Sequence, residues 1–145
     1  MITVNLKYDD AEKPKINDNW IQSICEKIFM DCKKNMVTIT IIFSNDLQLR
    51  KLNNEYFGED TDTDTISFNL EENGEPIEGE VYISVERVSE NAHIYKQNFI
   101  TECKRVIIHG CLHLLGYNDR SPVDKKRMTN LEEIYLSHRI NVKQI

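Results

Sequence analysis

The sequence has few residues that break or separate structural units. Its 145 residues include only three prolines and five glycines, and it has no repeat or low-complexity tract. Nothing therefore marks a linker or a second domain. The chain also lacks a run of about 18 apolar residues, as a membrane span requires, and its N-terminus, MITVNLKYDD, has no basic segment followed by an apolar one. We expect one domain over residues 1–145, no membrane association and a cytoplasmic location.

The cysteines lack the spacing of a metal cluster. None of the four, Cys25, Cys32, Cys103 and Cys111, belongs to a CxxC pair, and each lies in an apolar segment with helical periodicity. We interpret them as reduced core residues rather than as disulfides or metal ligands. Cys111 lies between the two histidines of the motif described below, which leaves a role as a ligand open for this residue.

Acidic side chains predominate, but they are unevenly distributed. The net charge is −6; residues 1–94 carry 9 basic and 19 acidic side chains, whereas residues 95–145 carry 9 basic and 5 acidic ones. This C-terminal third includes Lys104, Arg105, Arg120, Lys125, Lys126 and Arg127. They can contact phosphate groups or form a solvated helix surface, and charge alone leaves both interpretations open.

Hydrophobic periodicity predicts an α+β fold. Alternation of apolar and polar residues and an excess of β-branched residues predict strands over residues 2–7, 36–43, 65–70 and 80–84. Helical spacing predicts helices over residues 19–33, 45–56, 85–95, 99–115 and 122–137. Ser44 and Ser121 are the expected N-caps of two helices, and Gly74 and Pro76 indicate a turn over residues 71–79. We therefore expect a sheet of about four strands packed against about five helices.

The segment that is most informative about chemistry is RVIIHGCLHLLGYND, residues 105–119. Its two histidines, His109 and His113, are four residues apart, so both side chains lie on one face of the predicted helix and can converge on a single ion. The alternative is a pair of core histidines bonded to the backbone. Neighbouring imidazoles in an apolar helix need polar partners, which favours a shared cation. His93 and His138 have no such neighbours and are interpreted as surface or packing residues.

Gly116 is expected to end this helix, because glycine readily adopts the left-handed conformation found at helix C-termini. The chain can then reverse and bring Asp119 beside both histidines. Three protein ligands with a fourth position open to water is the arrangement of catalytic zinc. We therefore expect one divalent ion, held by His109, His113 and Asp119 at the end of a central helix. Zinc is the first choice, with manganese or nickel as alternatives.

Three segments resemble the YbeY family of bacterial metal-dependent endoribonucleases. HGCLHLLGYND, residues 109–119, is similar to the family signature HGxLHLxGYDH. LNNEYFGEDTDTDTISF, residues 52–68, resembles LNxxYRxxDxPTDVLSF, and GEVYIS, residues 79–84, resembles GDIxIS. Order and spacing agree with the family from about residue 52 to residue 132.

The resemblance implies an α+β fold, a zinc-like ion in a cleft and hydrolysis of single-stranded RNA. It also implies a role in ribosomal RNA maturation, notably at the 3′ end of the small-subunit RNA, and in ribosome quality control. The implied partners are ribosomal RNA and the small ribosomal subunit, while the oligomeric state stays open. Asp64, Ser67 and Glu80 match motif residues and can line the cleft or support the ligands, or have ordinary capping and turn roles.

The sequence departs from the family pattern at three positions. Asp119 stands where the family has a third histidine; a carboxylate is a legitimate zinc ligand, although it favours harder ions such as manganese. Phe57 replaces an arginine, and phenylalanine cannot hold a phosphate or stabilise negative charge. Asp62 replaces a proline, which should loosen the loop before Ser67.

Three functions are consistent with these residues. The first is a hydrolytic endoribonuclease that uses a metal ion. The second is a metallopeptidase, because HxxxHxxGxxD is also the ligand spacing of the metzincin zinc helix. Gly110, however, occupies the position of the glutamate general base in those enzymes. The third is a ribosome- or RNA-binding factor without catalysis, which the loss of the arginine at Phe57 motivates.

Overall fold

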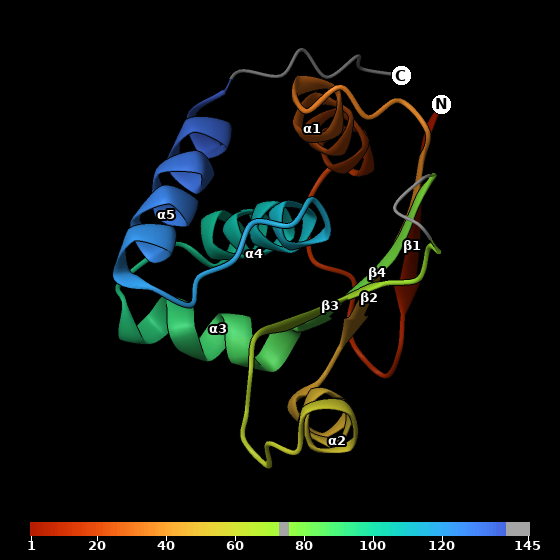
Figure 1. Cartoon of the computed structure of the whole chain (residues 1–145). Helices are drawn as coiled ribbons and strands as arrows, with labels where there is room; N and C mark the ends of the chain where they lie inside the picture. The colour runs from red at the N-terminus through yellow and green to blue at the C-terminus, as the bar shows by residue number, and fades with distance from the viewer. Residues whose placement is uncertain (73–75, 139–145) are drawn as a thin grey trace.

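A four-stranded mixed sheet forms one side of the protein (Figure 1). The computed structural model describes residues 1–72 and 76–138. The strands are β1 (Ile2–Tyr8), β2 (Val37–Ser44), β3 (Thr65–Asn69) and β4 (Ile77–Ser84), in the spatial order β1-β2-β4-β3. β1, β2 and β4 run parallel, and β3 pairs antiparallel with β4. β1 and β3 are therefore the edge strands.

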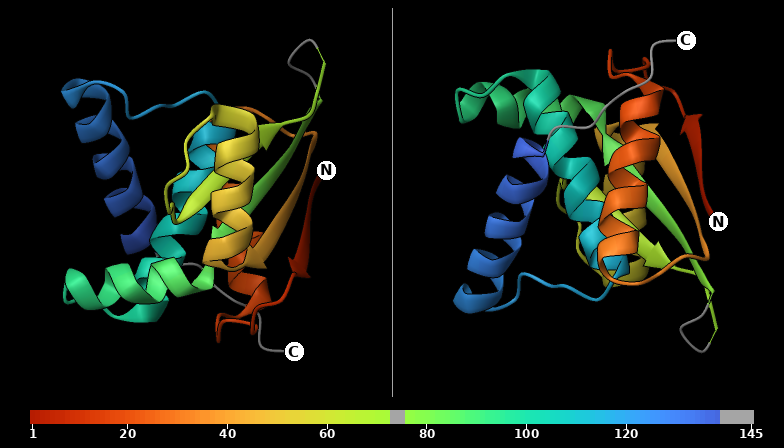
Figure 2. Two further views of the ribbon diagram at one scale, coloured as in Figure 1. Left: turned by 90° about the horizontal axis from the view of Figure 1, so that it is seen from below. Right: turned by 90° about the horizontal axis from the view of Figure 1, so that it is seen from above.

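The described residues form five helices: α1 (Asp18–Asp31), α2 (Asp46–Phe57), α3 (Val85–Ile94), α4 (Phe99–Leu114) and α5 (Pro122–Ser137). α4 lies between the sheet and α5, so α5 forms the outermost layer (Figure 1 and Figure 2). This arrangement confirms the predicted α+β fold with four strands, five helices and a central helix that carries the two histidines. None of the described helices is long and apolar enough to cross a membrane.

α4 is central because it is apolar around most of its circumference. Its buried residues include Val106, Ile107, Ile108, Cys111 and Leu112. Such a helix is stable only when other elements cover it, and here it contacts the sheet, α1, α3 and α5. The core therefore fixes α4, and with α4 the polar side chains that it carries.

Gly110 allows α4 to lie close against the sheet. A Cβ atom at this position would lie 2.5 Å from Val81 Cγ1, inside the closest approach of real carbon atoms. Val81 is fully buried in β4 and, being β-branched, has little freedom to move aside. The carbonyl of Gly110 also accepts a hydrogen bond from Ser67 Oγ at 3.3 Å. Any side chain at position 110 must therefore push α4 away from the sheet.

Gly110→Ala is expected to destabilise the protein. Because Val81 cannot move aside, overpacking should cost about 2–3 kcal/mol, and the better helix propensity of alanine offsets about 1 kcal/mol, which leaves a net loss of about 1–2 kcal/mol. Thermal unfolding followed by circular dichroism should show a melting temperature lower by about 3–8 °C. Thr129→Ala, at an exposed position of α5, is the matched control and should not lower it. A Gly110→Ala protein as stable as the wild type would contradict the close contact.

The N-cap of α2 is Asn45 and not Ser44, so this prediction is wrong. Ser44 is the last residue of β2 and pairs with Ser84 of β4, which fixes it in the sheet. Asn45 has extended backbone, and its side chain accepts a hydrogen bond from Gln48 N at 3.0 Å. Ser121 does cap α5, as predicted. Two adjacent residues were able to cap α2, and strand pairing decides between them.

β4 begins earlier than predicted, at Ile77, so Gly79 lies within the strand rather than in a turn. Gly79 pairs with Ile39 of β2. A Cβ atom at this position would lie 2.7 Å from Leu114 Cδ2 of α4 and 3.2 Å from Phe68 O, so the absence of a side chain eases packing against α4 and does not form a bend. Gly74, which the sequence places in the turn, lies outside the described residues.

Three of the four cysteines are reduced core residues, as predicted, whereas Cys32 lies outside the core. All four are free thiols; Cys25, Cys103 and Cys111 are buried, and Cys32 is half-buried at the end of α1. Cys111 lies against α1, with its Sγ 3.7 Å from Cys25 Sγ. Burial raises the pKa of Cys103 to about 12, which keeps this thiol protonated. The cluster of candidate metal ligands in the described part of the chain does not include Cys111.

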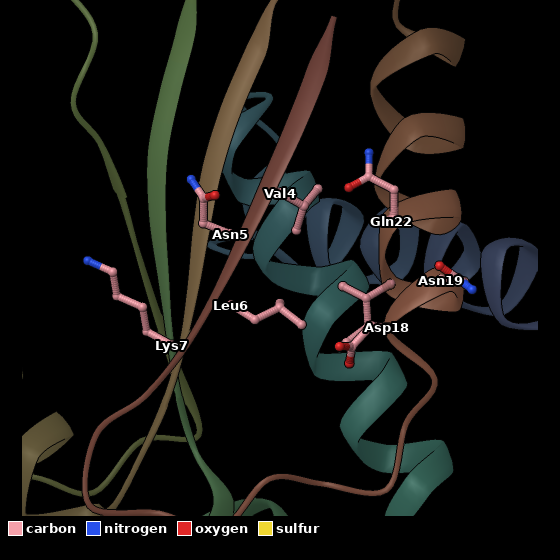
Figure 3. A pocket seen from close by; sticks show the side chains of 8 residues that line it. Val4, Asn5, Leu6, Lys7, Asp18, Asn19 and Gln22 are labelled. Atoms are coloured by element: carbon pink, nitrogen blue, oxygen red, sulfur yellow. The ribbon is translucent and has the colours of Figure 1, made fainter. Parts of the chain in front are cut away.

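A groove of about 610 Å³ runs between β1 and α1 (Figure 3). Val4 and Leu6 point from the strand toward α1, whereas Asn5 and Lys7 point to the opposite face of the sheet. The residues that line the groove come from β1 and the start of α1. The groove is thus at the edge of the sheet that lies farthest from α5 (Figure 1), and it takes no part in the histidine site.

Candidate metal centre

α4 places the side chains of His109 and His113 one turn apart on the same face. Their Nε2 atoms lie 2.9 Å apart, and the ring planes meet at 75°. Both imidazoles are half-buried, so they are reachable from solvent while the helix around them is packed. The spacing of the two histidines thus has the geometric consequence predicted from the sequence. His93 and His138 are exposed, as expected for residues outside the site.

The chain reverses directly after α4, at Gly116. This residue has φ +99°, a left-handed conformation that glycine adopts without strain. Tyr117 N donates to Leu112 O at 3.1 Å and closes the helix end. The reversal returns Asp119 to the histidines, with its Oδ2 3.8 Å from His109 Nε2. The ligand atoms of Asp119 and both histidines all lie within 4.8 Å of one another.

The chemistry of these donors fits one divalent ion. His109 Nδ1 lies 2.6 Å from Glu132 Oε2. Because a carboxylate only accepts, the proton on Nδ1 faces Glu132, and a neutral His109 then has its lone pair on Nε2. In that neutral state the lone pair faces His113 Nε2 at 2.9 Å and Asp119 Oδ2 at 3.8 Å, so it points into the group of candidate ligand atoms. Two imidazole nitrogens and one carboxylate oxygen bind zinc at about 2.0–2.2 Å, so the three side chains can hold a metal.

The two histidines differ in their electrostatic surroundings. Burial alone lowers the pKa of His109, but the hydrogen bond and negative charge of Glu132 outweigh it, and the pKa is raised. Burial and the charge on neighbouring His109 both lower the pKa of His113. His113 is therefore neutral near pH 7, the state in which an imidazole binds metal.

Glu132 of α5 is a buried carboxylate to which the sequence analysis assigns no role. Only 6% of its surface is exposed. Arg105, one turn before His109, lies beside it with Nη1 3.5 Å from Glu132 Oε1. The same guanidinium donates from Nη2 to Glu133 Oε1 at 2.6 Å and approaches Glu102 Oε2 to 3.9 Å. This network holds Glu132 against His109.

The sequence does contain a signal for Glu132. Met128, Glu132 and Tyr135 are the buried residues of α5 and follow helical spacing. A carboxylate in an apolar stripe is costly to bury unless it has a partner. Its partner is not visible in the sequence, because the contact joins two helices and residues 23 positions apart.

The family motifs also include Asp64, Ser67 and Glu80, and the first two of these lie near the site. Asp64 is half-buried; burial raises its pKa, and the charge of nearby His109 opposes the shift. Ser67 Oγ donates to the α4 backbone at 3.3 Å. Glu80, in contrast, accepts from Tyr82 OH at 3.4 Å on the opposite face of β4. The interpretation of Glu80 as a residue that lines or supports the site is therefore wrong.

Phe57 lies away from the histidines. Its ring stacks on Phe68 with centroids 6.0 Å apart. Phe68 alternates with Ser67 along β3, so it points away from α4. Arg50 of the same helix is paired with Asp60 at 2.8 Å. Phe57 therefore belongs to an aromatic cluster on the far face of the sheet.

The loop before β3 is anchored without the family's proline. Arg87 Nη2 donates to Asp62 Oδ2 at 3.0 Å and to Asp46 Oδ2 at 2.9 Å. Asn53 Nδ2 donates to Thr61 O at 3.2 Å. These hydrogen bonds hold the loop that leads to Asp64 and Ser67 where proline would have restricted the backbone.

Known proteins match the chain along most of its length. The family model described as Endoribonuclease YbeY matches residues 3–139. A protein named Endoribonuclease YbeY from Amoebophilus asiaticus is 44% identical over 123 residues, which cover 85% of this chain and 81% of the relative. Another of that name from Flavobacterium psychrophilum is 39% identical over 134 residues, 92% of each chain.

A solved structure agrees with the fold as well. The solution structure of a protein from Thermotoga maritima has a TM-score of 0.60 and 27% identity, and the match covers 92% of this chain and 87% of that one. The similarities thus extend over the sheet, the histidine helix and α5, and not over one motif alone. With a match from residue 3 to residue 139, the chain belongs to the YbeY family of endoribonucleases, which are hydrolytic nucleases.

Proposed function

We propose that the protein is a metal-dependent endoribonuclease that cuts single-stranded RNA at a centre formed by His109, His113 and Asp119. The observation that carries this proposal is the convergence of these three ligand atoms within 4.8 Å, in a member of an endoribonuclease family. We propose zinc as the ion, because two imidazoles and a carboxylate suit it. Manganese and nickel are the alternatives.

We further propose that the substrate is ribosomal RNA, cut at the 3′ end of the small-subunit RNA, and that residues 1–145 form a single such domain. The names of the relatives support RNA as the substrate class. The choice of ribosomal RNA, of the small subunit as partner and of ribosome quality control rests on the family resemblance of the motifs. A substrate of this kind places the activity in the cytoplasm.

Each residue of the centre has a separate task in this proposal. Bound zinc would lower the pKa of a water molecule and polarise a phosphoryl oxygen. Glu132 keeps the proton of His109 on Nδ1 and fixes the ring orientation. The turn at Gly116 positions Asp119, and Asp64 adds a half-buried carboxylate beside His109.

The metallopeptidase alternative meets a steric obstacle at Gly110. A peptidase of that type needs a glutamate general base directly after the first histidine. Even a Cβ atom at this position would lie 2.5 Å from Val81 Cγ1. The packing of α4 on β4 therefore disfavours a side chain of any kind where the base would have to be.

A cleavage assay tests the proposed function. Protein loaded with zinc or manganese is incubated with an end-labelled single-stranded fragment of small-subunit ribosomal RNA and with the same fragment annealed to its complement. We expect cleavage of the single strand only, and none by His113→Ala. Casein cleavage without RNA cleavage would indicate a peptidase. Tight RNA binding without cleavage under either metal would indicate a binding factor, and both results contradict the proposal.

A further inference from the structure

The six cations of residues 104–127 fall into two groups. Lys104 lies over the Trp20 ring, 4.7 Å from its centroid, and Arg105 is held among carboxylates of α4 and α5. Both are occupied by contacts within the protein. Four others are exposed and form no ion pair with any residue in the ranges 1–72 and 76–138. This basic segment consists of Arg120, Lys125, Lys126 and Arg127.

The basic segment begins at the metal centre. Arg120 directly follows Asp119, one of the proposed ligands. Lys125 precedes Glu132 by seven residues, which is two helical turns or about 10 Å along α5 and nearly the same side of the helix. Glu132 in turn contacts His109 at 2.6 Å. Arg127 lines a small pocket with Gly116, Tyr117 and Asn118, the turn that brings Asp119 to the histidines. Positive charge therefore lies near the candidate site at the start of α5, the helix that forms the outermost layer of the fold (Figure 2).

The basic segment contrasts with the acidic character of the N-terminal part of the chain. Residues 1–94 carry 9 basic and 19 acidic side chains, so the body of the protein repels a polyanion. Acidic groups within the same stretch of chain are Asp119, which belongs to the proposed ligands, and Asp124, which lines a small pocket with Arg127. Glu132 and Glu133 lie about two turns farther along α5 and are paired with Arg105. A strand that reaches the histidines therefore meets attraction on the α5 side and repulsion over most of the N-terminal part.

We propose that the basic segment binds the phosphodiester backbone of single-stranded RNA beside the metal centre. This inference rests on the proposed function and names the surface on which its substrate lies. Contacts of lysine and arginine with phosphates position a strand but do not read its bases. The segment thus supplies affinity and orientation, and the metal centre supplies the chemistry.

Two triple variants with equal loss of charge test the surface. The first combines Lys125→Gln, Lys126→Gln and Arg127→Gln on α5. The control combines Lys7→Gln, Lys13→Gln and Lys15→Gln, in β1 and the loop after it, on the side of the protein away from α5 (Figure 1). Both are assayed with metal-loaded protein and the single-stranded RNA fragment over a range of salt concentrations.

The α5 triple should raise KM about tenfold and lower the slope of log KM against log salt by about 2, as expected for three lost phosphate contacts. Its kcat and metal content should stay at wild-type values, because the ligands are untouched. The control triple should change neither KM nor the slope. Equal effects of the two triples would overturn the basic segment as the binding surface, while cleavage by the wild type would leave the proposed function standing.

If the wild type binds RNA but does not cleave it, the proposed function fails. Fluorescence anisotropy with the same RNA then measures the RNA affinity of the wild type and of both triples, and so tests the basic segment as the binding surface. Weaker binding confined to the α5 triple then supports the inference. Equal weakening of both triples, or no RNA binding by the wild type, overturns it.

Discussion

His109→Ala is expected to release the metal and to abolish RNA cleavage. The substitution removes the ligand that lies closest to both other ligands, with Nε2 2.9 Å from His113 Nε2 and 3.8 Å from Asp119 Oδ2. Loss of a direct ligand should cost more than the roughly 10–100-fold in affinity that loss of a supporting contact costs. Metal content by elemental analysis should fall from about one equivalent to almost none.

His93→Ala is the matched control for this experiment. His93 is an exposed histidine of α3 that belongs to no group of candidate metal ligands among the described residues, so its removal should leave metal content and cleavage unchanged. Circular dichroism establishes that the His109→Ala protein is folded. If it is not, His113→Ala, on the same helix face but without the contact to Glu132, gives the same comparison. Full metal content in either folded variant would show that the histidines are not the ligands.

Glu132→Gln is expected to weaken metal binding by about 10–100-fold while the ligands themselves stay in place. Glutamine preserves the size of the side chain but removes the charge that faces His109 Nδ1 at 2.6 Å. The imidazole then becomes a poorer donor and loses a fixed orientation. Competition with a chromophoric chelator measures the metal affinity directly, and cleavage at limiting metal should fall in parallel.

Glu133→Gln separates this effect from a general loss of negative charge. Glu133 also accepts a hydrogen bond from Arg105, at 2.6 Å, but it is an exposed carboxylate that does not contact His109. Its replacement should leave the metal affinity close to that of the wild type. If Glu132→Gln and Glu133→Gln lower the metal affinity equally, the buried carboxylate has no special role in orienting His109.

The sequence predicted correctly those features of the fold that depend on interactions between residues close together in the chain. α5 starts where Ser121 and Pro122 indicate, because capping of a free amide and a fixed φ both act within one turn. The predictions fail where contact with an element distant in the sequence determines the structure. Ser44 and Asn45 are both good caps, and pairing with β4 assigns Ser44 to the sheet. Gly79 resembles a turn residue, yet it lies in β4, where a Cβ atom would approach Leu114 of α4.

In the candidate site, too, the features set by nearby residues were predicted and those set by contacts between distant elements were not. The histidines four residues apart and the glycine that ends α4 are local, and they bring Asp119 back as predicted. Glu132 was missed because its partner lies on another helix. Glu80 was misplaced because the motif gives its position in the chain but not the face of the strand on which it lies.

The central claim is that one metal ion at these three residues is required for RNA cleavage, and a metal titration tests it most directly. Protein freed of metal by a chelator is titrated with zinc or manganese while cleavage of the single-stranded RNA is measured. We predict no cleavage before metal is added, a rise that saturates at about one equivalent, and no rise for His113→Ala. Cleavage that persists in metal-free protein, or that is restored by metal in His113→Ala, would contradict the claim.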